Sequence, residues 1–165
     1  MIAIYPGTFD PVTKSHIEII RRASTLCSKL IVGVAGDTLK NTLFPLGDRL
    51  NMMEEAIITG LSNKENISVM PFSGLLVNFA ETNDVKVIIR GMRALSDFEY
   101  EFKMAYMNKK LNESIETIFL PATEKENFIS SSFVREIARL GGCVSELVQQ
   151  HVERRLKKLY SYKGL

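Results

Sequence analysis

The stretch "IAIYPGTFDPVTKSH", residues 2–16, passes from an apolar run through a polar loop to the start of a helix. The run at residues 2–5 is short and apolar, which predicts a buried strand. Thr13 is a suitable N-cap for the helix that follows, and this would place His16 at the third helical position. A strand, a polar loop and a helix in this order are typical of the first unit of an α/β fold.

The same alternation continues along the chain. Apolar runs rich in β-branched residues predict further strands at residues 29–35, 67–72, 85–90 and 115–120. Apolar residues at helical spacing, from Ile19 to Cys27, predict a helix between the first two strands. Similar patterns predict helices at 46–61, 75–81 and 96–111, and two more near the C-terminal end. Because the strands are apolar almost throughout, we expect a parallel sheet covered on both faces. The fold class is therefore α/β, a doubly wound five-stranded parallel sheet, with residues 1–165 forming one domain.

Composition narrows the class of protein. The 165 residues are 45% apolar and carry 21 basic and 19 acidic side chains, a net charge of +2. This balance does not favour nucleic-acid binding by overall charge, although it leaves room for small anionic substrates. Cys27 and Cys143 lack the spacing of a zinc site or a disulfide framework, and no run suits a signal peptide or a membrane span. We therefore expect a cytoplasmic protein with free thiols.

Polar residues follow four of the predicted strands. They are residues 7–10, then Asp37 to Lys40, then Arg90 to Arg93, and finally the segment "NFISSSFVRE" at 127–136. Ligands of doubly wound sheets bind at the carboxyl ends of the strands, so these residues are expected to meet. Hydroxyls, cationic side chains and helix N-termini together are suited to holding phosphate groups.

Taken singly, each residue also has an ordinary structural interpretation. His16 could be a partly buried histidine, Lys40 a solvated lysine, and Ser130 to Ser132 a simple helix cap. Arg90 and Arg93 could pair with Asp97 or Glu99. Their joint placement at strand ends favours the phosphate site. The P-loop, GxGxxG, HExxH and CxxC patterns are absent from the sequence, which weakens kinase, dehydrogenase and metal-site interpretations.

The segment Thr13-Lys14-Ser15-His16 resembles the (T/H)xGH signature of the nucleotidyltransferase superfamily. The segments "YPGTFDPVT", "IIRGMRALSDFEYE", "MNKKL" and "FISSSFVRE" resemble, in order and spacing, the bacterial phosphopantetheine adenylyltransferase family. The resemblance covers nearly the whole chain. It implies a Rossmann-like nucleotidyltransferase fold and transfer of the adenylyl group of ATP to 4′-phosphopantetheine, giving dephospho-coenzyme A and pyrophosphate. It also implies Mg²⁺ held mainly by ATP phosphates and water, and a homohexamer.

The resemblance assigns roles to individual residues. His16 would stabilise negative charge on the α-phosphate, Arg93 would meet the β and γ phosphates, and Thr8 would bind the acceptor phosphate close to the reacting α-phosphate. The acceptor would be bound by Thr8, Lys40, Leu76, Arg90 and Asn108. ATP would be surrounded by Thr8, Phe9, His16, Gly91, Met92, Arg93, Glu101, Glu126, Asn127, Phe128, Ile129, Ser130, Ser131 and Ser132. The catalytic set is Thr8, His16, Lys40 and Arg93.

Ser15 departs from the signature, which has glycine at that position. A hydroxymethyl group there would crowd a nucleotide at the helix N-terminus, so we expect weaker ATP binding with activity retained. Two alternatives stay open: transfer to another phosphate acceptor, such as nicotinamide mononucleotide or glycerol phosphate, and a nucleotide or coenzyme A sensor without catalysis.

Four residues have structural interpretations. Cys27 should lie in the core, Cys143 in a loop, and Asp10 should fix the loop after the first strand. His151 falls in a segment of alternating charge, which predicts an exposed terminal helix that could contact another subunit or nucleic acid.

Overall fold

The computed structural model describes residues 1–37, 41–93 and 95–161, with side chains for all of these except 95–97. Five parallel strands form one sheet in the order β3-β2-β1-β4-β5. Their bounds are β1 Ile2–Gly7, β2 Lys29–Ala35, β3 Ile67–Phe72, β4 Val87–Met92 and β5 Glu116–Pro121. The predicted α/β sheet is confirmed. The main differences are at β1, which continues through Gly7, and at β4, which begins and ends two residues later than expected.

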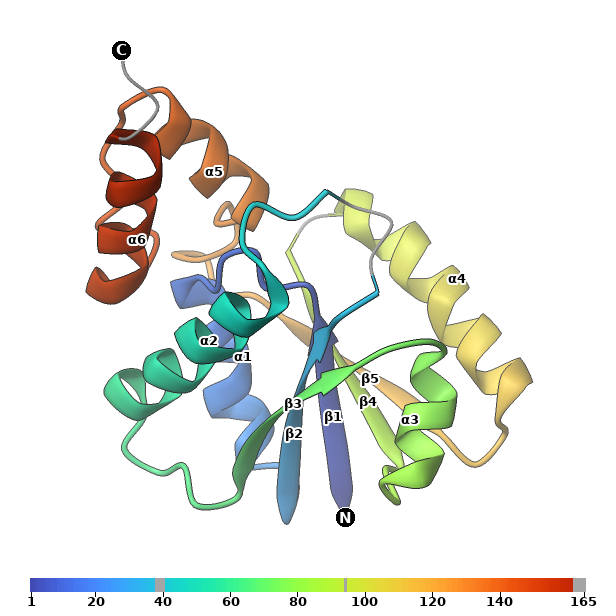
Figure 1. Ribbon diagram of the computed structural model, residues 1–165. Coiled ribbons are helices and arrows are strands. Elements are labelled where there is room, and N and C mark those ends of the chain that lie inside the picture. Colours follow the sequence, from blue (N-terminus) through green and yellow to red (C-terminus); the bar gives the residue numbers. More distant parts are fainter. Residues whose placement is uncertain (38–40, 94, 162–165) are drawn as a thin grey trace.

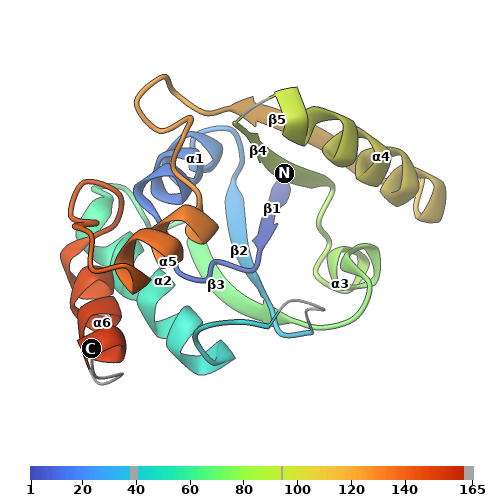
Figure 2. The same cartoon turned by 90° about the horizontal axis from the view of Figure 1, so that it is seen from above.

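Six helices pack on the two faces of this sheet (Figures 1 and 2). They are α1 Lys14–Ser24, α2 Leu46–Gly60, α3 Leu76–Thr82, α4 Leu95–Leu111, α5 Ser131–Arg139 and α6 Gln150–Ser161. Figure 2 shows α1, α2, α5 and α6 on one side of the sheet and α3 and α4 on the other. The sheet is therefore doubly wound, as the apolar strands predict.

Strand β1 explains how one sheet supplies two cores. Successive side chains of a strand point to opposite faces. Ala3 and Tyr5 belong to the larger core, which α1, α2, α5 and α6 cover, while Ile4 belongs to the smaller core beneath α3. All three side chains are buried, so β1 lies at the centre of the fold and its carboxyl end is fixed firmly.

Helix α6 corrects the expectation of an exposed terminal helix. His151, Val152 and Leu156 are buried, and the Nε2 atom of His151 lies 3.0 Å from the carbonyl oxygen of Met52 on α2. The prediction was wrong because the charged residues 153–155 separate these buried positions and hide the apolar face of the helix in the sequence. Arg155 adds an ion pair of 2.9 Å to Asp48.

The two cysteines behave as predicted. Cys27 packs against the larger core and burial raises the pKa of its thiol, while Cys143 is exposed in the loop after α5. Within the described residues, every helix is too short or too polar to cross a membrane.

Candidate active site

A cavity of about 700 Å³ opens at the carboxyl ends of β1 and β4. It is bordered by the N-termini of α1 and α5 and by one side of α4. Many of the predicted site residues line it: Thr8, Phe9, His16, Leu76, Arg90, Gly91, Arg93, Glu101, Asn108, Ser130, Ser131 and Ser132. The topology therefore brings together residues that are up to 124 positions apart, as the strand-end rule predicts.

The first turn of α1 forms a capping box between Thr13 and His16. The Thr13 hydroxyl accepts the backbone N–H of His16 at 3.4 Å, and the Thr13 N–H donates to Nδ1 of the His16 ring at 3.0 Å. The predicted N-cap and the position of His16 are confirmed. Because a backbone N–H can only donate, Nδ1 must be the acceptor, and the proton of the neutral ring lies on Nε2.

The electrostatic environment keeps this ring neutral. Burial, with the positive charge of Arg93 acting in the same direction, lowers the pKa of His16 to about 3. The ring of Phe9 meets the imidazole edge-on, with 5.0 Å between centroids. At neutral pH, His16 therefore offers an N–H donor to the cavity without carrying a charge.

The loop after β1 is shaped by close contacts. Phe9 has a φ of +49° and folds its ring under Gly7, where an added Cβ would lie 2.7 Å from the ring. Glycine is required at that position because any side chain would displace Phe9. The Asp10-Pro11 peptide bond is cis.

Asp10 fixes the loop, as predicted. Its side chain is buried, and its carboxylate accepts the backbone N–H groups of Leu43 at 2.7 Å and Phe44 at 2.9 Å. Arg135 of α5 donates to the Asp10 carbonyl oxygen and lies 3.4 Å from its carboxylate. Asp10 therefore joins the end of β1 to the segment before α2 and to α5.

Arg90 is held by an ion pair that spacing did not predict. Its Nε and Nη2 atoms donate to the two carboxylate oxygens of Glu101 at 2.6 and 2.7 Å, and Nη1 donates to the carbonyl of Pro6 at 2.9 Å. Burial alone would lower the pKa of Arg90, but the hydrogen bonds and charge of Glu101 outweigh it, so the pKa is raised. Glu99, the partner considered from sequence, pairs instead with Lys103. Glu101 thus orients Arg90 at the cavity wall.

Hydrogen bonds also fix the N-terminus of α5 at the cavity. Ser130 caps α5 by accepting the Phe133 N–H at 3.2 Å, and Ser131 donates to the Pro11 carbonyl at 2.8 Å. Arg93 donates to the carbonyl of Ile129 at 3.3 Å. These contacts link the end of β4, the loop after β1 and the start of α5.

The remaining predicted residues lie elsewhere. Met92, Glu126, Asn127, Phe128 and Ile129 are not among those that line the cavity, although Ile129 is the partner of Arg93. Phe128 is exposed, and Glu126 contacts Thr123. Lys40 falls outside the described residues. Ser15 is buried in the first turn of α1 and lines the cavity.

Two functional candidates were missed by sequence reasoning. Tyr5 lines the cavity, and burial raises the pKa of its hydroxyl to about 12 against the opposing charges of Arg90 and Arg93. Arg49 is 2% exposed and donates to three backbone carbonyls. Its signal was present in the sequence, because position 49 falls three residues after Leu46 on the apolar stripe of α2, where a charged residue is unusual.

Comparison with known proteins defines the class first. Residues 4–137 match the family model described as cytidylyltransferase-like. The solved structure of Plasmodium falciparum nicotinic acid mononucleotide adenylyltransferase complexed with NaAD superposes with a TM-score of 0.74 over 98% of this chain and 97% of that one. At 18% identity, this likeness concerns the fold alone. The fold is that of a nucleotidyltransferase-like α/β protein.

Sequence relatives then define the family. The phosphopantetheine adenylyltransferase of Moorella thermoacetica is 48% identical over 161 residues, covering 98% of each chain. That of Rhodospirillum rubrum is 50% identical over 155 residues, covering 94% of this chain and 90% of the relative. The chain belongs to the phosphopantetheine adenylyltransferase family.

Proposed function

We propose that the protein transfers the adenylyl group of ATP to 4′-phosphopantetheine, giving dephospho-coenzyme A and pyrophosphate. The observation that carries this proposal is the convergence on one cavity of a neutral histidine donor, three arginines and two helix N-termini. Such a set suits two bound polyanions that must be held against each other. Among the reactions that such a site could support, membership of the phosphopantetheine adenylyltransferase family favours this one.

Catalysis would rest on alignment and charge stabilisation. A phosphate oxygen of the acceptor attacks the α-phosphorus of ATP, the bond from that phosphorus to the oxygen bridging to the β-phosphate breaks, and pyrophosphate leaves with the electron pair. The attacking oxygen is already an anion, so the step needs no strong general base. The His16 Nε2–H would donate to the α-phosphate as negative charge develops there.

The acceptor side of the cavity would be formed by Thr8, Arg90, Leu76 and Asn108, with Lys40 joining them on the ground of family resemblance. Arg90 is oriented for this role by Glu101, which occupies one edge of its guanidinium group. Asn108 is 9% exposed on α4 and lines the same cavity as Arg90. This arrangement would place the acceptor phosphate near the end of β4.

The ATP side would be formed by the turn at the end of β4 and the start of α5. Arg93 would meet the β and γ phosphates. The nucleotide would be surrounded by the backbone of Phe9, Gly91 and Met92, by Glu101 and by the segment 126–132. The Ser130 to Ser132 hydroxyls lie at the cavity wall, where they can donate to phosphate oxygens.

Mg²⁺ fits this site as a cation held by phosphate oxygens and water. Among the described residues, no three His, Cys, Asp or Glu side chains are grouped to hold a metal ion. Two carboxylates of the cavity already have partners, because Asp10 accepts backbone N–H groups and Glu101 binds Arg90. The ion would neutralise charge on the β and γ phosphates of ATP.

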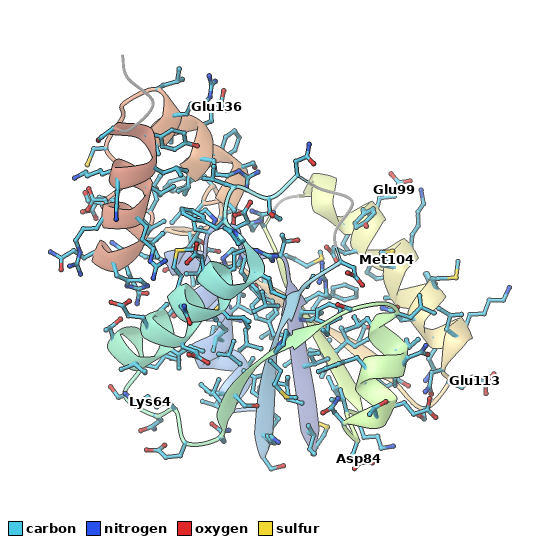
Figure 3. All side chains as sticks on the ribbon, in the orientation of Figure 1. Lys64, Asp84, Glu99, Met104, Glu113 and Glu136 are labelled. Atoms are coloured by element: carbon cyan, nitrogen blue, oxygen red, sulfur yellow. The ribbon has the colours of Figure 1, made fainter. Side chains whose placement is uncertain are left out.

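The active form is proposed to be a cytoplasmic homohexamer. Helix α4 supports assembly because Phe98, Tyr100, Tyr106 and Met107 on it are exposed and apolar or aromatic. Figure 3 shows the labelled Glu99 and Met104 on the same helix. A helix with this much exposed apolar surface is suited to pack against another protein copy.

Measuring pyrophosphate release with a panel of acceptors tests the proposal. ATP and magnesium are supplied with 4′-phosphopantetheine, nicotinamide mononucleotide or glycerol phosphate. We expect release with 4′-phosphopantetheine at a kcat/KM at least a hundredfold above the others. Preference for another acceptor would assign a different transfer reaction, and ATP binding without release for any acceptor would indicate a sensor.

A further inference from the structure

Tyr5 lies on β1 with its ring in the larger core and its hydroxyl at the active cavity. The residue is 6% exposed, belongs to the larger core and lines the cavity. Its ring meets that of Phe9 edge-on, with 5.4 Å between centroids. A phenylalanine ring would make these core contacts equally well, so the hydroxyl group needs an explanation of its own.

The Tyr5 hydroxyl has no hydrogen-bond partner within the described residues. The two cations at the end of β4, Arg90 and Arg93, donate to other groups. Ser68 Oγ is the only fully buried side-chain polar atom of the described residues that lacks a partner, so the Tyr5 hydroxyl is not sealed inside the protein. Because the hydroxyl of a buried tyrosine normally has a partner, this one is available to a ligand in the cavity.

Gly91 keeps this hydroxyl open to the cavity. An added Cβ at position 91 would lie 3.4 Å from the Tyr5 hydroxyl oxygen and 3.2 Å from Cγ1 of Ile19 on α1. Gly91 lies near the end of β4 and lines the cavity itself. Glycine at this position therefore leaves space beside an unpaired hydrogen-bond donor.

The two sides of the sheet show which substrate this hydroxyl can meet. Ile89 of β4 belongs to the larger core, so Gly91, two residues further along the strand, faces the same side as α1. Arg90 points to the opposite side and binds α4. The Tyr5 hydroxyl thus shares its side of the sheet with His16, in the part of the cavity proposed to hold ATP.

The electrostatic surroundings favour an anion beside the hydroxyl. Burial raises the pKa of Tyr5 to about 12, against the lowering effect of Arg90 and Arg93, so the hydroxyl keeps its proton at neutral pH and can donate it. The charge of Arg93 also acts on His16, which is the other neutral donor on this side. Two neutral donors influenced by one cation suit a phosphate group better than a neutral or cationic group.

We propose that the Tyr5 hydroxyl donates a hydrogen bond to a phosphate oxygen of ATP, on the side of the cavity that also carries His16 and Arg93. The identity of the ligand rests on the proposed function. The contact itself rests on the unpaired hydroxyl, the space that Gly91 leaves and the nearby cation. Tyr5 keeps its proton throughout, so the contact binds and orients the phosphate without proton transfer.

Tyr5→Phe tests the contact, because it removes the hydroxyl oxygen and keeps the ring. We expect the Kd for ATP with magnesium, measured by isothermal titration calorimetry, to rise by about tenfold or more, since the lost hydrogen bond is to a charged group. The Kd for magnesium tripolyphosphate, which lacks the nucleoside, should rise by a similar factor. The Kd for 4′-phosphopantetheine should change by less than about twofold, because the acceptor is proposed to bind on the other side.

Tyr160→Phe is the matched control. Tyr160 lies on α6, packs against the larger core and is not among the residues that line the active cavity. The same chemical change at this position should leave the Kd values for ATP and tripolyphosphate within about twofold. Thermal melts without ligand show whether each variant is folded, and melts with ATP should show reduced stabilisation for Tyr5→Phe alone.

Gly91→Ala provides a second test if Tyr5→Phe does not fold. It leaves the tyrosine in place and puts a methyl group beside its hydroxyl, so it should weaken tripolyphosphate binding by itself. A folded Gly91→Ala protein that binds tripolyphosphate as tightly as the unmodified protein would count against the inference.

Three results of the calorimetry would overturn the inference. They are unchanged Kd values for ATP and tripolyphosphate in folded Tyr5→Phe, a loss for ATP alone, which would assign the contact to the nucleoside, and no binding of tripolyphosphate by the unmodified protein. These measurements need no turnover. An unmodified protein that binds ATP with the help of Tyr5 but releases no pyrophosphate with any acceptor would support this inference and refute the transfer reaction.

Discussion

The two helix N-termini at the cavity differ in how they are built. Helix α1 begins inside the molecule: Thr13, Ser15 and Ile17 are all buried, and Thr13 and His16 cap each other. Helix α5 begins near the surface, where Ser130 caps the helix by accepting the N–H of Phe133 and the Phe133 side chain is exposed. Both ends present N–H groups to the same cavity.

This difference separates two tasks of a transfer site. The start of α1 is fixed before any substrate binds, which suits a donor that must meet charge only as it develops. The start of α5 has three serine hydroxyls, two of which contact each other at 3.0 Å and are free to exchange that contact for a phosphate. We infer that α1 supplies catalysis and α5 supplies nucleotide binding.

The buried start of α1 should make the protein acid-sensitive. The folded-state pKa of His16 is about 3, below the unfolded value of 6.5, so only the unfolded state gains a proton between these values. The contribution of His16 to the free energy of unfolding is therefore fully present above pH 6.5. It is lost as the pH falls, by about 1.4 kcal/mol per pH unit or roughly 2–3 kcal/mol by pH 4.5.

Urea unfolding of the unmodified protein and His16→Gln at pH 7.5 to 4.5 measures this effect. The glutamine variant cannot gain the proton, so its stability should fall less steeply by the amounts stated. Parallel curves for the two proteins would show that His16 is not held neutral.

Removing the cap of α1 should have the next largest effect on the free energy of unfolding. Thr13→Ala loses the hydroxyl that accepts the His16 N–H at 3.4 Å, at a position 2% exposed where water replaces it poorly. We expect a loss of about 1–2 kcal/mol in unfolding free energy. Chemical denaturation at pH 7.5 checks this, and a change below about 0.3 kcal/mol would contradict the capping role.

Ser15→Gly tests the start of α1 through its effect on ATP binding. Ser15 is buried and lines the cavity in the first turn of α1, so removing its hydroxymethyl group gives the nucleotide a closer approach. We expect KM for ATP to fall by a few-fold, with a loss of about 0.5–1 kcal/mol in stability from glycine in a helix. An unchanged or raised KM for ATP would refute the crowding interpretation.

Ser130→Ala should have the smallest effect. The Ser130 hydroxyl caps Phe133 at 3.2 Å, but this helix start is open to water, which can replace it. The loss should be about 0.5 kcal/mol, near the lower limit for N-caps. Thermal melts of Ser130→Ala and Thr13→Ala, run side by side, test the contrast directly. Equal losses would remove the distinction between the two helix starts.

The sequence predicted the fold well because hydrophobic period is a local signal. Strands at residues 29–35 and 67–72 were placed at their observed bounds. The error in α6 arose because His151 is buried among charged neighbours by contact with Met52, 99 positions away. A local pattern carries no information on such a contact.

The sequence likewise predicted part of the candidate site and missed the rest. That Thr8, His16, Arg90 and Arg93 would share one cavity followed from the rule that parallel strands present their carboxyl ends together. The pairing of Arg90 with Glu101 depends on how α4 packs beside β4, which spacing does not specify. Arg49 could have been singled out as a charged residue on the apolar stripe of α2, but its partners are backbone carbonyls, which the sequence does not identify.

The most direct test of the account is acceptor-dependent pyrophosphate release by the unmodified protein and by His16→Ala. ATP and magnesium are supplied with and without 4′-phosphopantetheine, and both proteins are first shown to be folded. The account predicts release that requires the acceptor and falls by about a hundredfold or more in the variant, the scale expected for losing a charge-stabilising donor. Release that is independent of the acceptor, or a variant within about threefold of the unmodified rate, would contradict it.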